Sequence, residues 1–485
     1  MLPRFELPRF EIVARHRPIA IVDDATVGGR LDLRGTDVLE VSEPLPRPAP
    51  FAAVEVELDP GDGRGAASVS LSDPDGRVLR AHVDDDLVSI SIAHPTAALV
   101  DGEPPRVRSR RHGRCSRVPE ALAIALTGHH VAALTKEAGR WRVRCRVDLA
   151  ELAGEPFGAG GSVVHEARWT ASLRAGVRVA RPASAWRAGG FGQLGLRDVR
   201  WASHADGRPY RLVDGTVLLT ATSAGPGWFD TAHTSVWSFD PASGAVQRRG
   251  ALYFTRPDLP GVHGEHATHL VRDAGRWLVA TSTWTTLPAH PRRRSGARVD
   301  VVLAEEPLRD LDRGEHVLTT RTLDLPTPGP RSVGVWDPHL LRTDDGTWVV
   351  GYVSARRFFD FHPVLAAGAS LETLRLQASA EDRTATEGTT LLPTPGGLVV
   401  LASDGRDNRR GIRARYPVFD SALREIDTVQ APYPSNIPWP SVLAPQLPSD
   451  DDWWLLTFDG APAGGRLPGY GTHGDLVVMR GRTRR

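Results

Sequence analysis

Short apolar runs separated by turn residues dominate the hydrophobic pattern of this chain, and the clearest instance lies between residues 334 and 355. There the apolar run His339–Leu341 and the strongly apolar run Trp348–Val353 flank an Asp-Asp-Gly turn. Two apolar runs joined by an acidic turn with glycine predict a β-hairpin. Asp337 stands at the mouth of this hairpin, directly behind Trp336. A carboxylate in that position is easier to explain by chemistry than by packing.

The same layout recurs five times in the C-terminal two thirds of the chain. Each unit has a leading polar or aromatic residue, an apolar strand, a turn with Asp or Gly, and a second strand rich in Val, Leu and Trp. A further strand or pair of strands follows, so each unit holds about four strands. Five such units predict a five-bladed β-propeller, because radial packing buries both faces of each sheet. The leading residues are Asp198, Glu265 with His266, Asp337, Glu387 and Trp439.

The N-terminal third shows a second β pattern. From residue 51 to 180, alternating or β-branched runs are separated by turns such as Asp-Pro-Asp-Gly, and no long amphipathic helix interrupts them. This pattern predicts an antiparallel β-sandwich, similar in shape to concanavalin or laminin-G domains. The expected fold is therefore all-β. A β-sandwich with an N-terminal extension covers residues 1–181, a linker lies at 182–190, and a five-bladed β-propeller covers 191–485.

Composition narrows the class of partner. A chain of 485 residues is too long for one ordinary core, which agrees with two domains. The 59 basic and 58 acidic residues leave a net charge of +1, so no global field attracts nucleic acid or an acidic membrane. The N-terminus has no continuous apolar stretch, and no run of 18 apolar residues occurs. We therefore expect a cytoplasmic protein. Cys115 and Cys145 are expected to be buried free thiols.

Propeller geometry would bring residues that are distant in sequence to one site. The innermost strand of each blade lines the central channel, and the residues that lead these strands meet at one mouth. Asp198, Asp337 and Glu387 would converge there, with Glu265 as a rival acid. The alternative is that these acids cap turns on the surface. Converging carboxylates suit glycoside cleavage, in which one acid protonates the leaving oxygen and another activates water or attacks the anomeric carbon.

Several aromatic and basic residues near the strand entrances are candidates for substrate binding. Flat indole rings stack on sugar faces, whereas tryptophans in the middle of strands are expected to pack between blades. His233 and Arg356 are further candidates for subsites, and His266 or His269 could contact substrate or metal. The candidate indole groups are those of Trp201, Trp228, Trp284, Trp336 and Trp439.

The order and spacing of the acids resemble those of glycoside hydrolase family 43, whose members are five-bladed propellers, and are similar to those of families 32 and 68. The resemblance covers residues 191–485, with 139 positions from Asp198 to Asp337 and 50 from Asp337 to Glu387. It implies that Asp198 is the general base, that Asp337 modulates the pKa of the acid and orients it, and that Glu387 is the general acid. It also implies a structural calcium ion in the central channel, near His473.

The chain departs from the family pattern in two places. The Asp-Pro pair that usually marks the base stands at Asp337, and Gly264–His266 has no assignable counterpart. The expected activity is hydrolysis of an arabinofuranosyl, xylosyl or fructosyl linkage in an oligosaccharide, and a transglycosidase or phosphorylase variant stays open. One alternative is a non-catalytic propeller that binds carbohydrate. The other is a metal-dependent hydrolase or lyase that uses His263, His266, His269 and His473.

Overall fold

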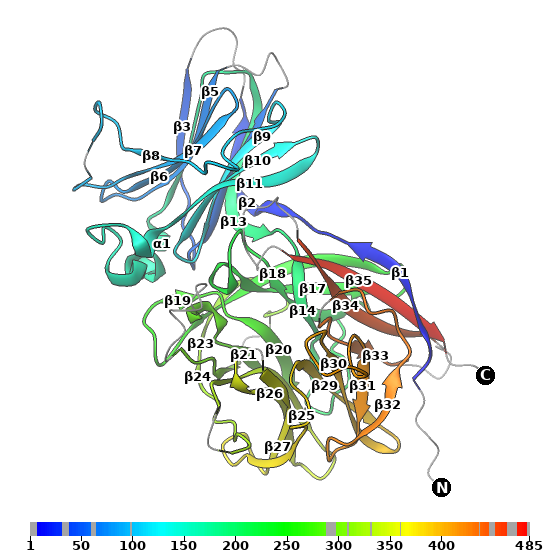
Figure 1. Cartoon of the computed structure of the whole chain (residues 1–485). Helices are drawn as coiled ribbons and strands as arrows, with labels where there is room; N and C mark the ends of the chain where they lie inside the picture. Colours follow the sequence, from blue (N-terminus) through cyan, green and yellow to red (C-terminus); the bar gives the residue numbers. More distant parts are fainter. Residues whose placement is uncertain are drawn as a thin grey trace.

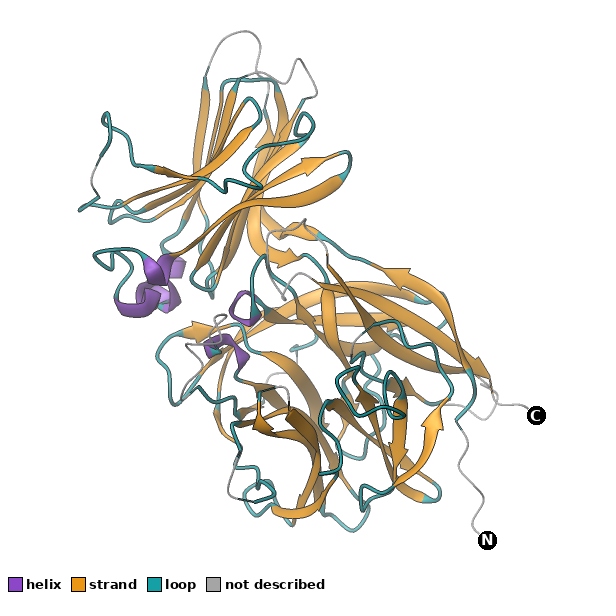
Figure 2. Cartoon of the chain, viewed as in Figure 1, coloured by secondary structure: helices purple, strands orange, loops and turns teal. Residues whose placement is uncertain are grey.

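The structure is a computed structural model, and nearly all of its secondary structure is β-strand (Figures 1 and 2). It describes residues 7–31, 38–59, 65–97, 99–287, 297–307, 310–329, 332–358, 360–435, 437–445, 452–462 and 473–482. None of the helices in these ranges has the length and apolar character needed to cross a membrane. The helical elements are α1 (Ala167–Ala171) and the 3-10 segments η1 (Leu149–Glu151), η2 (Ala159–His165), η3 (Phe229–Thr231) and η4 (Trp284–Thr286).

Two six-stranded sheets form the upper part of the molecule in Figure 1. They pack face to face, because apolar residues of both sheets, such as Val54 and Ile124 from one and Val69 and Ile90 from the other, share one core. The first sheet has the order β11 (Arg140–Asp148), β10 (His130–Glu137), β9 (Ala121–Thr127), β4 (Phe51–Leu58), β13 (Ala183–Gln193), β2 (Ala20–Arg30). The second has the order β3 (Leu39–Pro44), β12 (Arg174–Val179), β5 (Ala66–Ser72), β6 (Val78–Asp84), β7 (Leu87–Ala93), β8 (Arg106–Val107).

Five further sheets follow in sequence order and form the lower part of the molecule (Figure 1). The first contains β14 (Leu196–Trp201), β16 (Val217–Ser223), β17 (His233–Asp240), β18 (Ala245–Thr255), β19 (Val262–His263) and β23 (Gly314–Thr319). The second contains β15 (Ser203–His204), β20 (His266–Asp273), β21 (Arg276–Ser282), β22 (Val301–Glu306) and β24 (Arg321–Thr322). The third contains β25 (Gly334–Arg342), β26 (Trp348–Arg357), β27 (Asp360–Gly368) and β28 (Arg375–Ser379). The fourth contains β29 (Thr386–Thr394), β30 (Gly397–Asp404), β31 (Tyr416–Phe419) and β32 (Glu425–Val429). The fifth contains β33 (Ser441–Leu443), β34 (Asp452–Pro462), β35 (His473–Arg482) and β1 (Phe10–His16).

The predicted hairpin is confirmed, since β25 and β26 pair antiparallel from Gly334–Ala355 to Arg342–Trp348 across the acidic turn. We call the strand that begins each repeat its leading strand; these are β14, β20, β25, β29 and β33. Polar contacts connect the leading strands of neighbouring sheets. The backbone N–H of Leu340 on β25 donates to Nδ1 of His269 on β20 (3.0 Å), and Ser441 on β33 donates to the carbonyl of Val199 on β14. The leading strands are thereby held in fixed relative positions.

The outer face of the first six-stranded sheet packs on the first of the five sheets. Phe51 and Ala53 of β4 point away from the core that Val54 occupies, and they join Ala251 and Tyr253 of β18 in a second buried cluster. From Phe51 to Val54 both sides of β4 are therefore apolar, as expected where a strand is buried on both faces, whereas Glu55 and Glu57 follow on the outer side. This interface holds the first six-stranded sheet against β18 in the first of the five lower sheets.

Two segments differ from the sequence-based expectation. The proposed linker at 182–190 lies almost entirely in β13, which pairs with β4 and β2 in the first sheet. Within the expected N-terminal extension, β1 pairs antiparallel with β35 and forms the outer strand of the last sheet. Neither pairing has a local sequence signal, because in each case the partner strand lies more than 100 residues away or at the other end of the chain. Cys115 and Cys145 are buried and free, as predicted.

Candidate active site

A β-bulge recurs at the same place in the leading strand of four sheets. The ladder register shifts between Arg197 and Arg200 in the first sheet, and at the equivalent points of the next three. Each bulge contains one residue with a positive backbone φ. Bulges interrupt regular pairing and redirect side chains, often next to active sites. The positive-φ residues are Asp198 (53°), Ala267 (60°), Asp337 (59°) and Gly388 (73°).

The bulges direct side chains from different sheets into one cavity of about 140 Å³. Asp198 and Asp337 reach it from the positive-φ position itself. Glu387 reaches it from the preceding position, which Arg197, His266 and Trp336 occupy in the other sheets. The three predicted catalytic acids therefore line the same cavity. The remaining lining residues are Trp228, Phe229, Trp284, Leu287, Phe358, Phe361, Ala385, Asp407, Ile437 and Trp439.

The Asp198 carboxylate is held in its ionised form. Burial by itself raises its pKa, but contact with His266 and the charge of Arg197 outweigh burial, so the pKa of Asp198 lies below its ordinary value. Arg197 Nε donates to Asp198 Oδ2 over 3.2 Å, and His266 Nδ1 lies 3.8 Å from the same oxygen. The latter distance is that of a close electrostatic contact and is too long for a hydrogen bond. Asp198 is thus an anion with a cationic neighbour.

The pKa values of Glu387 and Asp337 are raised, in contrast to that of Asp198. Burial, reinforced by the negative charge of Asp198, raises the pKa of Glu387 to about 8, although the indoles of Trp439 and Trp336 act against this shift. Burial and the like charges of Glu387 and Asp198 raise the pKa of Asp337 well above its ordinary value. Mutual repulsion of carboxylates in a buried cavity favours their protonated forms. At neutral pH the cavity therefore combines an ionised Asp198 with a Glu387 carboxyl group that holds its proton.

Aromatic rings wall the cavity on one side. Phe229 lies 4.7 Å from Trp284 between ring centroids, and Trp284 lies 4.9 Å from Trp336. The guanidinium carbon of Arg197 lies 5.5 Å from the centroid of Phe229, within the range of a cation–π contact. These contacts fix the rings in place, so the cavity presents flat apolar faces next to the carboxylates.

Arg200 supplies a buried positive charge beneath the acids. From β14, its guanidinium donates to the carbonyl of Asp337 on β25 and to that of Thr389 on β29, each over 2.9 Å. It also lies 4.7 Å from the centroid of Trp439. Burial lowers the pKa of Arg200 to about 10, so the group stays charged at neutral pH. One side chain therefore connects three leading strands and partly offsets the negative charge of the acids.

The position beside Arg200 does not suit a calcium ion, while the calcium ion that the family resemblance implies near His473 stays a prediction. Calcium takes six to eight oxygen ligands, whereas here the carbonyls of Asp337 and Thr389 already accept from a buried cation. A guanidinium at this position also repels a second cation. The side chain of His473, at the start of β35, lies outside the described residues.

Four predicted binding residues lie elsewhere. Trp201 packs in the core and donates from Nε1 to the carbonyl of Ser441 (3.1 Å). Burial among Phe51, Phe191 and Tyr253 lowers the pKa of His233 to about 3. The other two are held by ion pairs. Glu265, the rival acid, is fully buried and pairs with Arg256 (3.0 Å), and Arg356 pairs with Asp360 (2.8 Å).

The histidines proposed for a metal-dependent hydrolase are dispersed. Of the three whose side chains the structure describes, only His266 lines the cavity of the acids. His269 stacks on His339, with ring centroids 4.1 Å apart. His263 stacks on His165 at 4.4 Å, in a different cavity. These positions rule out one shared ligand set for His263, His266 and His269.

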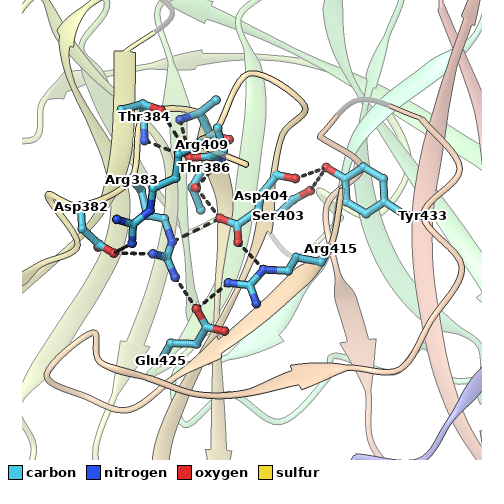
Figure 3. A network of polar contacts seen from close by, with 12 residues as sticks. Asp382, Arg383, Thr384, Thr386, Ser403, Asp404, Arg409, Arg415, Glu425 and Tyr433 are labelled. Atoms are coloured by element: carbon cyan, nitrogen blue, oxygen red, sulfur yellow. Dashed lines mark hydrogen bonds and ion pairs between the residues drawn. The ribbon is translucent and has the colours of Figure 1, made fainter. Parts of the chain in front are cut away.

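A buried polar network supports the strand that carries Glu387 (Figure 3). Thr386, the preceding residue, donates to Asp404 Oδ1 over 2.6 Å. Asp404 is completely buried and also contacts Arg415 (3.1 Å) and Arg383 (3.4 Å). The hydroxyl of Tyr433 donates to the Asp404 carbonyl (2.8 Å) and accepts from the backbone N–H of Ile437 (3.0 Å), a residue of the cavity wall. The network thus positions two sides of the cavity.

Sequence reasoning missed Arg197, Arg200 and Phe229, although each had a usable signal. Arg197 and Arg200 flank Asp198 in an otherwise apolar strand, and Phe229 follows Trp228 directly. A buried strand rarely contains arginine unless its charge is paired. The two arginines could therefore have been assigned to the acids before the structure was known.

Comparison with known proteins yields only distant likenesses. No family model and no curated protein matches the sequence. One similar solved structure is the GH43_1 enzyme from Xanthomonas citri, with 16% identity over 57% of this chain and 86% of that chain and a TM-score of 0.37. Another is an α-L-arabinanase from Cellvibrio cellulosa, with 10% identity, coverages of 59% and 92% and a TM-score of 0.34. A protein of unknown function from Dyadobacter fermentans has 12% identity, coverages of 88% and 99%, and a TM-score of 0.34.

Proposed function

We propose that this chain is a glycoside hydrolase that removes a terminal arabinofuranosyl, xylosyl or fructosyl unit from an oligosaccharide. The observation that carries the proposal is that the pKa values of two acids in one cavity are shifted in opposite directions. The pKa of Asp198 is lowered, and that of Glu387 is raised to about 8. Pairs of carboxyl groups whose environments separate their pKa values divide the roles of acid and base. Neighbouring aromatic faces suit a sugar ring.

In the proposed fold, the five successive sheets are the blades of a five-bladed β-propeller, and the two six-stranded sheets form a β-sandwich. The bulges in the leading strands of four blades bring one or two residues each to the mouth of the channel: Arg197 with Asp198, His266, Trp336 with Asp337, and Glu387. The sandwich, of concanavalin or laminin-G type, is the accessory domain, and the propeller carries the reaction.

In the proposed reaction, Glu387 donates its carboxyl proton to the glycosidic oxygen as the bond from that oxygen to the anomeric carbon breaks. Asp198 takes a proton from a water molecule, whose oxygen forms the new bond to the anomeric carbon. Asp337 lies close enough to Glu387 for their charges to interact, and in this proposal it orients the acid and modulates its pKa. After release of both products, Glu387 regains a proton and Asp198 loses one through solvent. A cavity of about 140 Å³ is well below the roughly 300–1,000 Å³ of sites for larger ligands, which favours a single terminal sugar unit.

The test uses a panel of aryl α- and β-glycosides together with the variants Asp198→Asn and Glu387→Gln. We expect at least one substrate to be cleaved, Asp198→Asn to lose about 10²–10⁴-fold in kcat, and Glu387→Gln to lose as much on the substrates whose leaving groups need a proton. Asp345→Asn is the matched control, because Asp345 is an exposed acid in the turn between β25 and β26, outside the cavity. Full activity in both site variants would overturn the assignment. Sugar binding by calorimetry without cleavage would instead support the non-catalytic alternative.

A further inference from the structure

A second cavity, of about 900 Å³, lies between the upper and lower sheets. Its upper wall comes from the turn between β9 and β10, from the end of β11 and from η2. Its lower wall comes from η3, η4 and the segment around β19. The packing is close at Gly128, where a Cβ atom would lie 2.7 Å from the carbonyl oxygen of Asp230. Gly128 also has a φ of +60°, so glycine suits this position for two reasons.

Three side chains on the walls of this cavity have the arrangement of metal ligands. The ligand atoms of His129, His130 and Asp230 all lie within 4.8 Å of one another. His130 Nε2 is 2.8 Å from Asp230 Oδ2, and His129 Nε2 is 3.5 Å from the same oxygen. Bond lengths of about 2.0–2.1 Å to zinc in tetrahedral geometry imply ligand separations of about 3.3 Å. The two distances to Asp230 Oδ2, 2.8 and 3.5 Å, lie on either side of that value.

The side chains are buried and incompletely satisfied. His130 is 4% exposed and Asp230 is 8% exposed. His130 Nδ1 and Asp230 Oδ1 are buried atoms without a hydrogen-bond partner. Buried polar atoms normally have partners, and Asp230 Oδ1 is available as a second carboxylate ligand beside Oδ2, whereas His130 turns its other nitrogen, Nε2, toward Asp230. Asp148 Oδ1 lies 3.6 Å from His129 Nε2 and adds a second negative charge nearby, although Arg146 brings a positive charge to the same cavity.

We propose that His129, His130 and Asp230 bind one divalent transition-metal ion of the zinc type at the junction of the two parts of the chain. Two imidazoles and one carboxylate suit zinc, cobalt or nickel, whereas calcium and magnesium prefer oxygen ligands alone. Three protein ligands leave a coordination position open to the cavity, as at zinc sites with an exchangeable fourth ligand. This site is separate from the acids and does not depend on glycoside cleavage.

The ion would also link the upper sheets to the wall of the acid cavity. Asp230 belongs to η3, which begins at Phe229, and Phe229 contacts Arg197 and Trp284 beside the acids. His129 and His130 belong to the other part of the chain. Metal binding would therefore connect η3 to the other part of the chain and stabilise the interface between the two parts.

The experiment uses the full chain without a histidine tag, stripped of metal with a chelator and dialysed. Zinc is titrated by calorimetry, and cobalt is titrated while visible absorption is recorded. We expect one equivalent of each metal to bind, with the absorption of a four-coordinate cobalt site. His130→Ala and Asp230→Asn should each weaken zinc binding at least tenfold, whereas His94→Ala, which removes a histidine outside the cavity, should not.

X-ray absorption of the zinc-loaded wild-type chain is the second measurement, and it requires no variant to fold. The proposal expects scattering from two imidazole rings and a bond of about 2.0–2.1 Å to nitrogen. Absence of stoichiometric binding, or binding that is equal in the wild type and both ligand variants, would overturn it. None of these measurements uses catalysis, so a failure here is distinguishable from a failure of the proposed glycosidase activity.

Discussion

Asp198 and Asp337 occupy equivalent positions in two different sheets, each as the positive-φ residue of a bulge, with φ values of 53° and 59°. Asparagine, aspartate and glycine tolerate this conformation far better than branched residues do. We therefore expect neither Asp198→Asn nor Asp337→Asn to strain the backbone, and Asp337→Asn to change Tm only slightly, whereas Asp198→Asn also loses its ion pair with Arg197 and lowers Tm for that reason. Asp198→Val and Asp337→Val should lower Tm by several degrees, because a β-branched residue is strained there. Differential scanning calorimetry of the four variants checks this, and equal losses in all four would contradict it.

The pH profile of activity should have an alkaline limb set by Glu387. A general acid works in its protonated form, so kcat/KM should fall about tenfold per pH unit above the pKa of about 8. Asp198 works as an anion, and its lowered pKa places the acidic limb below about pH 4. The measurement is kcat/KM from about pH 3 to about pH 10, which covers both limbs. Glu387→Gln should lose the alkaline limb on a substrate whose leaving group needs no proton, and a limb retained in that variant would assign it to another group.

The stability of the fold should depend on the same group. The pKa of Glu387 is about 8 in the folded chain, against 4.5 for a glutamate exposed to water. Between these values the folded state holds a proton that the unfolded state releases, so stability falls as pH rises. Glu387→Gln removes this dependence. We expect the variant to exceed the wild type in Tm by a few degrees at pH 8, and the difference to shrink toward pH 5. A difference independent of pH would contradict this.

Arg200→Lys should be destabilising although it preserves the charge. A lysine cannot reproduce the two directional donors that Arg200 gives to the carbonyls of Asp337 and Thr389. Each buried carbonyl left without a donor costs about 1–3 kcal/mol. We expect Tm to fall by at least several degrees and kcat to fall with it. Addition of calcium to the variant should restore neither, and restoration by calcium would show that the position accepts an ion.

Asp404→Asn should reduce both stability and activity, since Asp404 supports the strand of Glu387 from beneath. Breaking one partner of a buried ion pair costs about 3–5 kcal/mol. Asp382→Asn is the matched control, because Asp382 belongs to the same network in Figure 3 but its side chain is 53% exposed. We expect the control to shift Tm by no more than about 2 °C. The readouts are Tm and the kcat ratio between activated and unactivated substrates, and the ratio should change only in Asp404→Asn.

The repeated pattern of strands and turns was sufficient to bring Asp198, Asp337 and Glu387 to one place. Each acid stands at the start of an apolar strand, and a repeated fold carries equivalent positions to the same side. The aromatic residues that precede or follow these strands, such as Trp336 and Trp439, were placed in the cavity by the same reasoning. Their arrangement depends on the repeat and not on the details of any one turn.

Side-chain direction could not be predicted where the bulges alter the strand register. Glu265 and His266 are neighbours, but only His266 lines the cavity, because Glu265 precedes β20 and its carboxylate contacts Arg256 and Thr285. The bulges leave no mark in the composition of their segments. Trp201 lies three residues beyond Asp198, after the bulge in β14, and falls on the packing side. The role of β1 was hidden because its partner strand stands at the opposite end of the sequence.

The pairing of β1 with β35 has a consequence for how the chain is made. β1 must wait, unpaired, until β35 has been synthesised, while the sheets between these two strands can form. During that interval the backbone groups of β1 have no partner strand and are available to other chains. Completion of this sheet therefore comes after synthesis of the other four, and production yield should depend on how well residues 10–16 are protected until β35 emerges.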